Sequence, residues 1–160
     1  MAIRYGNSLA NTIYGTTAAD LIYGYGGNDT IYTGGGNDKA FGGTGNDRLY
    51  MSTGNDTAYG DSGHDLLSGQ SGFDLLYGGT GDDDIYGGDQ DDDLYGQSGY
   101  DYLDGGTGHD YLNGGTQNDD LYGGSGNDTL IGGAGNDDLT GGSGFDDFVF
   151  FDYNGDDFVW

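Results

Sequence analysis

An aspartate recurs at every ninth residue along most of the chain, and this spacing is the strongest chemical signal in the sequence. The series runs without an insertion from Asp29 to Asp146, and a glycine-rich segment such as residues 42–46 precedes each aspartate. Carbonyl oxygens stay accessible in glycine turns, and with a fixed carboxylate they are the hard oxygen ligands that Ca²⁺ prefers. The spacing therefore predicts a series of calcium sites. The candidate carboxylate ligands are Asp29, Asp38, Asp47, Asp56, Asp65, Asp74, Asp83, Asp92, Asp101, Asp110, Asp119, Asp128, Asp137 and Asp146.

The glycine turns supply the other candidate ligands. In the intact loops we expect the carbonyl groups of the second and third glycines to take part in binding. These residues are Gly43, Gly45, Gly79, Gly81, Gly106, Gly108, Gly124, Gly126, Gly133 and Gly135.

The aspartates belong to a nine-residue phrase, G-G-x-G-x-D-x-U-x, in which U is apolar. Its last three residues, such as Arg48-Leu49-Tyr50, alternate outward, inward and outward as in a short β-strand. One buried side chain in nine residues makes no core, but stacked units form a continuous apolar column. The phrase therefore predicts an all-β solenoid. The expected column residues are Ile13, Ile22, Ile31, Ala40, Leu49, Ala58, Leu67, Leu76, Ile85, Leu94, Leu103, Leu112, Leu121, Leu130, Leu139 and Phe148.

Composition limits the partners. The 160 residues carry 28 acids against three bases, for a formal charge of −25, with 38 glycines and no cysteine. Such a chain is not expected to bind nucleic acid, because phosphate contacts need lysine and arginine. No apolar run is long enough for a membrane span, so no membrane insertion is expected. The lack of cysteine excludes disulfides and thiolate metal sites.

The phrase closely resembles the calcium-binding nonapeptide of the RTX (repeats-in-toxin, hemolysin-type) family, and the resemblance covers residues 6–149. It implies a right-handed parallel β-roll with two nonapeptides in each 18-residue coil. It also implies calcium ions between turns on the same side, with Asp29 starting one row and Asp38 the other. Seven stacked turns on each side imply roughly twelve ions, which would offset about 24 negative charges.

Departures from the phrase divide the single domain, residues 1–160, into three parts. Residues 1–20 keep the register but lose glycines and are expected to form an N-terminal cap that binds calcium poorly. Residues 21–149 form the calcium-binding repeats, although Thr33 and Met51 replace first glycines, and Gln90 and Gln117 replace third glycines. Residues 150–160 are expected to form an aromatic C-terminal cap. There the segments 145–150 and 155–160 are ten residues apart instead of nine.

The position after U is often aromatic. Two ladders of stacked rings are expected, one on each sheet, at about the 4.8 Å strand spacing. Such ladders stabilise a sheet, and they also suit an adhesive face for a protein, a glycan or a second copy of the chain. The expected ladders are Tyr23, Phe41, Tyr59, Tyr77 and Tyr95 on one sheet and Tyr14, Tyr32 and Tyr50 on the other.

No catalytic constellation emerges, and we expect no enzyme. His64 and His109 are separated by an odd number of repeats and therefore fall on opposite sides of the roll. The asparagines before the aspartates are similar to the rows of calcium-dependent ice-binding rolls. Phe73, Tyr100 and Phe145 interrupt those rows here, which leaves ice binding as a minor alternative.

The sequence indicates a secreted structural protein that folds when it binds Ca²⁺, such as a surface-layer or filament subunit that assembles end to end. Residues 1–15 hold no secretory signal, whereas residues 157–160 are similar to the endings of proteins exported by the one-step type I route. The alternative is the C-terminal folding and secretion module of a larger enzyme or toxin. The initial methionine favours a whole protein.

Overall fold

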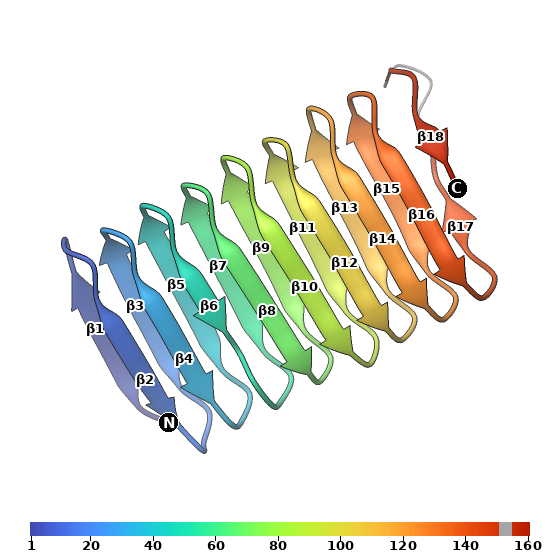
Figure 1. Ribbon diagram of the computed structural model, residues 1–160. Coiled ribbons are helices and arrows are strands. Elements are labelled where there is room, and N and C mark those ends of the chain that lie inside the picture. The colour runs from blue at the N-terminus through green and yellow to red at the C-terminus, as the bar shows by residue number, and fades with distance from the viewer. Residues whose placement is uncertain (151–154) are drawn as a thin grey trace.

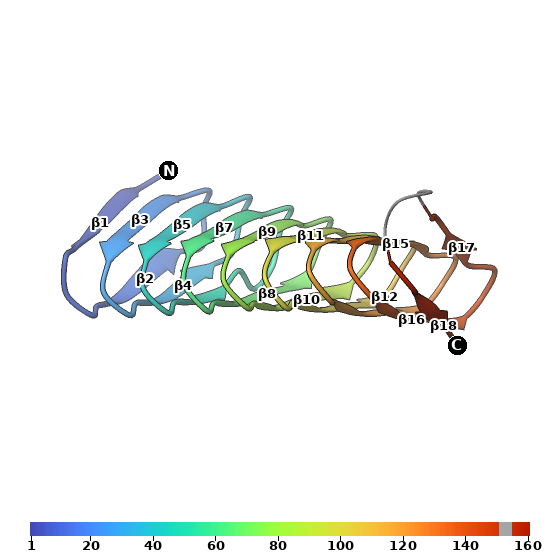
Figure 2. The same cartoon turned by 90° about the horizontal axis from the view of Figure 1, so that it is seen from above.

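The computed structural model describes residues 1–150 and 155–160, and these residues form strands and turns. The strands build two parallel sheets of nine strands each, and the chain passes from one sheet to the other after every strand (Figure 1). The sheets face each other as the two long sides of a flat β-solenoid (Figure 2). The predicted all-β solenoid is therefore confirmed.

Odd-numbered strands form one sheet and even-numbered strands the other. The odd strands are β1 (Ile3–Asn7), β3 (Leu21–Gly26), β5 (Lys39–Thr44), β7 (Thr57–Ser62), β9 (Leu75–Thr80), β11 (Asp93–Ser98), β13 (Tyr111–Thr116), β15 (Thr129–Ala134) and β17 (Asp147–Phe148). The even strands are β2 (Thr12–Thr16), β4 (Thr30–Gly34), β6 (Arg48–Tyr50), β8 (Leu66–Ser71), β10 (Asp84–Asp89), β12 (Tyr102–Thr107), β14 (Asp120–Ser125), β16 (Asp138–Ser143) and β18 (Phe158–Val159).

Each coil contains 18 residues, as predicted, because equivalent residues of adjacent coils pair directly. Leu76 pairs with Leu94, for example, and Leu94 pairs with Leu112. Most strands are six residues long, twice the three residues expected from the phrase, because they continue through the first two glycines and the residue after them. The reversal is therefore confined to the third glycine and its neighbours, where a positive φ such as the 144° of Gly108 requires glycine.

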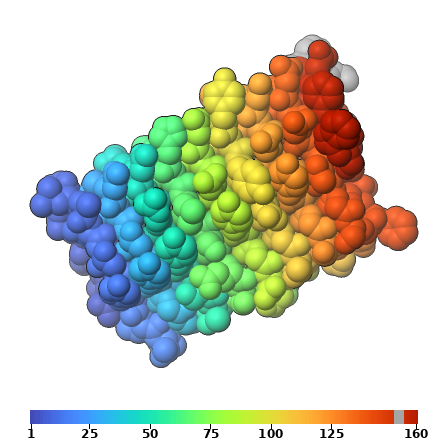
Figure 3. All heavy atoms as spheres, viewed as in Figure 1, coloured from blue at the N-terminus to red at the C-terminus, as the bar shows by residue number. Residues whose placement is uncertain are grey.

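The core is the column of U residues between the sheets. All of them from Ile22 to Leu139 are fully buried, and Phe148 packs against the end of the column. This confirms the predicted core. The coils follow one another in order along a slab-shaped body, so every coil contacts mainly its two neighbours (Figure 3).

The C-terminal register differs from the expected step of ten residues. Val159 pairs with Leu139 and so occupies a column position eleven residues after Phe148. The pairing of Phe158 with Asp138 and of Val159 with Leu139 sets this register, whereas a step of ten would place Phe158 at the column position. Of the proposed aromatic cap, Phe151 lies outside the described residues, and Phe158 and Trp160 are exposed.

Candidate calcium centre

The repeat aspartates occupy the turns at both edges of the slab. The Asp29 row (Asp29 and every eighteenth residue to Asp137) follows odd strands, and the Asp38 row (Asp38 and every eighteenth residue to Asp146) follows even strands. Each side chain turns inward beside the first glycine of its own loop. Asp29 to Asp137 are all no more than 3% exposed. The structure thus brings the predicted carboxylates together in two buried rows.

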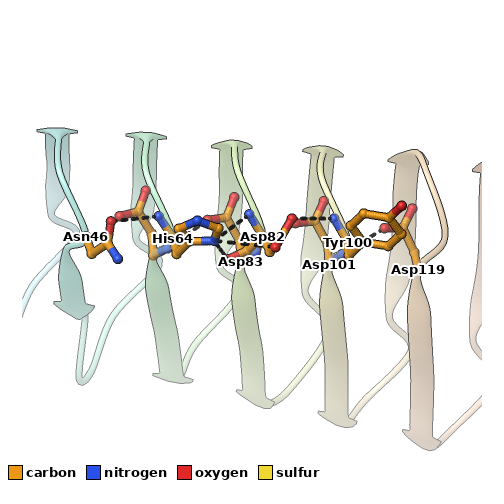
Figure 4. A network of polar contacts seen from close by, with 8 residues as sticks. Asn46, His64, Asp82, Asp83, Tyr100, Asp101 and Asp119 are labelled. Atoms are coloured by element: carbon orange, nitrogen blue, oxygen red, sulfur yellow. Dashed lines mark hydrogen bonds and ion pairs between the residues drawn. The ribbon is translucent and has the colours of Figure 1, made fainter.

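One oxygen of each carboxylate holds adjacent coils together. The Oδ1 atom of Asp101 accepts a hydrogen bond from the main-chain N–H of Asp83 at 2.9 Å, and Asp119 accepts one from Asp101 at 2.8 Å. Figure 4 shows this row of carboxylates along the turns. The same bond recurs in both rows, so the aspartates are fixed in position by backbone that the repeat itself supplies.

The second oxygen has no partner. In thirteen of these aspartates, Asp29 to Asp137, the Oδ2 atom is buried and accepts no hydrogen bond. Buried carboxylate oxygens are almost always satisfied, because an unpaired one costs about 1–3 kcal/mol or more. Thirteen repeated exceptions indicate positions that a cation would complete.

Main-chain carbonyl groups converge on the same spaces. A Cβ atom added to Gly105 would lie 2.5 Å from Oδ2 of Asp110 and 2.7 Å from the carbonyl oxygen of Gly123 in the next coil. A Cβ on Gly87 would likewise lie 2.5 Å from Oδ2 of Asp92 and 2.6 Å from the Gly105 carbonyl. The first glycine of each phrase therefore keeps open a space lined by oxygens from two coils.

The pKa values of the row aspartates show how unfavourable a charged carboxylate is in these positions without a cation. Burial raises the pKa of Asp83, Asp92 and Asp119 to about 8, and that of Asp47 and Asp110 to about 7. Desolvation disfavours the charged carboxylate, and neighbouring aspartates of the same row add to the shift. A bound divalent cation would reverse both effects.

The donor set suits calcium rather than a transition metal. Among residues 1–150 and 155–160, no three acidic or histidine side chains form a metal cluster. A cation here must take most of its ligands from main-chain carbonyls, and Ca²⁺ accepts six to eight such oxygens in flexible geometry.

The glycines predicted as calcium ligands and the first glycines, which were not predicted, occupy different positions in the coil. The ten predicted second and third glycines all have a positive φ; the second glycines lie near the ends of strands and the third glycines in the turns that follow. The first glycines, such as Gly105 and Gly123, were not predicted as ligands, yet the spaces beside them are lined by the orphaned Oδ2 atoms and by first-glycine carbonyl oxygens of the next coil. Their position in the phrase is constant, and that constancy is the signal that could have identified them.

The degenerate loops differ in the expected places. Asp20 has both oxygens satisfied, because its Oδ2 accepts from the N–H and the hydroxyl of Thr16, at 2.7 and 2.8 Å, and its Oδ1 from the N–H of Ala2. These hydrogen bonds, that of Ala2 first, lower its pKa. In the Asp38 row the fully buried side chains of Thr33 and Met51 stand where first glycines would leave space, and β6 is shortened to three residues.

The chain was then compared with known proteins. The sequence model of the RTX calcium-binding nonapeptide repeat matches seven overlapping segments that run without a gap from residue 5 to residue 148, namely 5–40, 34–67, 41–76, 59–94, 68–103, 86–121 and 113–148. The chain belongs to the RTX calcium-binding repeat family. Comparison with curated proteins gives no significant match.

Membership of the RTX family makes the orphaned carboxylates part of a calcium-binding β-roll.

A second row of polar contacts runs outside the RTX aspartates. His64 accepts the N–H of Asp82 at 3.0 Å through Nδ1, and His109 accepts that of Asn127 at 2.7 Å. The two histidines lie on opposite edges, as predicted, and each continues its asparagine ladder (Figure 4 shows His64). No helix that could span a membrane occurs in the described part of the chain.

Proposed function

We propose that this RTX chain is a secreted, non-catalytic structural protein whose folding is driven by calcium. The observation that carries the proposal is the set of thirteen buried Oδ2 atoms without a partner. Each is an unfavourable element of the metal-free roll, and those whose loops keep the first glycine would be ligands in the metal-bound roll.

The overall charge supports the same mechanism. A chain of formal charge −25 with 38 glycines loses much backbone entropy and gathers like charges when it folds without metal. Ions that bind only the stacked form shift the equilibrium toward it by mass action. Roughly twelve ions would offset about 24 charges.

Calcium concentration then sets where the chain folds. Calcium is far scarcer inside a cell than outside it, so the chain would stay unfolded until export. We place its structural role outside the cell and its export on the type I route. Residues 157–160, an aspartate followed by three hydrophobic residues, support this route.

Self-assembly end to end is the structural role that we propose. A cavity of about 560 Å³ lies at the N-terminal coil, lined by residues of β1 and β2 and by Asn11. Arg4 stands there at a column position with its Nε atom buried and unpaired, and Val159 and Phe148 end the columns at the other extremity. Stacking of coils from another copy would continue both columns.

A second candidate is a calcium-dependent folding and secretion module of a larger secreted enzyme or toxin. The same residues 157–160 favour it. In that case the roll folds with calcium but shows no self-assembly of its own, and fusion of the chain to an unrelated protein would direct export through a type I apparatus.

The test is a calcium titration followed by far-UV circular dichroism and light scattering. We expect a cooperative gain of β-structure that a chelator reverses, with rising scattering if the ends assemble. A spectrum that stays unchanged to several millimolar calcium would overturn the folding mechanism, and folding without added scattering would favour the second candidate. Magnesium at the same concentration is the control, because its strict octahedral geometry suits these carbonyl-rich loops poorly.

A further inference from the structure

The outer face of the odd-strand sheet is nearly free of charge, although the chain is strongly acidic. In the six-residue strands the second residue of the following phrase also points outward, and there Tyr25 of β3 stacks on Tyr23 while Asp61 of β7 is exposed. The other outward side chains are the seventh and ninth residues of the phrase. In β1 to β15 they are mostly apolar or aromatic: Ile3, Leu21, Lys39, Thr57, Leu75, Asp93, Tyr111 and Thr129, and Tyr5, Tyr23, Phe41, Tyr59, Tyr77, Tyr95, Asn113 and Ile131. We call these sixteen residues the odd face. The even sheet carries Arg48, Asp84, Asp104, Asp120 and Asp138 at the corresponding positions.

The aromatic ladder gives the odd face a regular, rigid surface. Rings from Tyr23 to Tyr95 stack with centroids 4.9–5.0 Å apart and planes within 16° of parallel, which confirms the predicted ladder. Tyr5 extends it at 5.7 Å. Such stacking fixes the rings and leaves one side of each half-exposed to solvent.

Two of the sixteen residues are charged, with opposite signs and at matching distances from the centre of the face, and Asp61 on β7 is a further exposed charge beside them. Lys39 is on β5, next to β7, and Asp93 is on β11, next to β9, so they flank the central pair of strands β7 and β9. Each is also two strands of this sheet from the nearer end of the series β1 to β15. The ammonium of Lys39 is held on the face, 5.2 Å from the ring centre of Phe41 and 4.9 Å from that of Tyr59. Asp93 is exposed.

We propose that the odd face is the interface of a two-fold symmetric dimer with a second copy of the chain. A two-fold axis parallel to the strands, between β7 and β9, reverses the strand order of the second copy. It places β5 on the second copy's β11 and β7 on its β9. Lys39 of each copy then faces Asp93 of the other, twice in one interface, as self-complementary contacts require.

The same operation matches the aromatic residues. Phe41 of one copy faces Tyr95 of the other, and Tyr59 faces Tyr77. Sheets pack face to face at about 10 Å, which suits flat faces covered by rings. An approach through the even sheet or the turns places aspartates of both copies in contact, which is repulsive in so acidic a chain, whereas in the two-fold dimer Asp61 faces Gly79 of the other copy. The odd face spans eight strands but only two outward residues along each strand, which is small for an interface. We therefore expect a dissociation constant in the micromolar range or weaker.

Charge exchange tests the proposal. In saturating calcium we expect sedimentation equilibrium to show a monomer–dimer equilibrium for the natural chain. Lys39→Asp and Asp93→Lys each create two like-charged contacts and should each weaken the dimer at least about tenfold. The double variant exchanges the charges and should restore most of the affinity. Arg48→Asp, which makes the same charge change as Lys39→Asp on the other sheet, should leave the dimer unchanged.

The calcium-induced circular dichroism of each variant separates folding from association. Asp93→Lys is the decisive single variant. Within one chain Asp93 does not contact the ammonium of Lys39, so the substitution removes no ion pair inside the monomer. A strictly monomeric natural chain at a few hundred micromolar would overturn the proposal. So would a folded double variant that stays monomeric, or an association of the natural chain that Asp93→Lys leaves unchanged, because end-to-end growth does not involve Asp93.

Discussion

Replacement of Gly105 by alanine probes the proposed calcium space with a single methyl group. The φ of Gly105 lies outside the left-handed region, so the backbone accepts alanine without strain. The new Cβ would lie 2.5 Å from Oδ2 of Asp110 and 2.7 Å from the carbonyl oxygen of Gly123. These distances are too short for carbon, so the two oxygens must move apart and the space between the coils is lost.

The magnitude has two parts. Loss of one ion at a calcium concentration of a hundred times its dissociation constant removes about 2.7 kcal/mol from the free energy of unfolding. Overpacking adds about 1–3 kcal/mol. We therefore expect Gly105→Ala to reduce the free energy of unfolding by about 4–6 kcal/mol in saturating calcium, and to lower the number of bound ions by at least one.

The assay is urea unfolding in saturating calcium, combined with isothermal titration calorimetry for the number of ions. Gly35→Ala is the matched control. Gly35 also lies outside the left-handed region, and its added Cβ would be 3.2 Å from the movable hydroxyl of Thr53 and from no carboxylate. If Gly105→Ala bound as many ions as the natural chain and unfolded at the same urea concentration, the assignment of these spaces to calcium would be refuted.

Three further perturbations test the calcium sites of the Asp38 row, the packing of the core and the protonation of the buried aspartates. Met51→Gly opens a space beside Asp56 that a fully buried side chain now fills, so the number of bound calcium ions should rise by calorimetry; an unchanged number would contradict the idea that first glycines define the sites. Leu94→Ala should lower the free energy of unfolding in calcium by about 2–5 kcal/mol, because Leu94 is fully buried; a urea midpoint shift worth less than about 1 kcal/mol would exclude a packed column. In chelator, the pKa values near 8 of Asp83, Asp92 and Asp119, raised from an ordinary 3.8, mean that the folded chain retains protons that the unfolded chain releases. The metal-free roll should therefore be most stable below about pH 4 and lose stability as the pH rises through about 8, so circular dichroism that showed more β-structure at pH 8 than at pH 4 would contradict these shifts.

The sequence was sufficient for the architecture because one strict period controls it. Every ninth residue from Ile22 to Leu139 could be assigned to the core, and every repeat aspartate to an edge, since a repeat fixes spatial neighbours by arithmetic. The ladder from Tyr23 to Tyr95 followed from the same arithmetic.

What the period could not give was the detail within a coil. The three-residue strand expected from Arg48-Leu49-Tyr50 holds for β6 alone among the strands of the regular repeats, because elsewhere the glycines after it also pair with their neighbours. The spaces beside the Oδ2 atoms are also lined by first-glycine carbonyl oxygens, and only coordinates reveal which carbonyl groups converge there. The C-terminal register was wrong by one residue, since Phe158 and Val159 are both apolar and only pairing with Asp138 and Leu139 decides between them.

The most direct measurement of the central claim is a crystal structure grown in calcium, with anomalous scattering recorded to locate the ions. We predict two rows of peaks, one along each edge of the slab, each peak next to an Oδ2 atom of a repeat aspartate and the carbonyl of a first glycine. Peaks confined to the surface aspartates, or an ordered roll with no peaks beside the buried rows, would contradict the account.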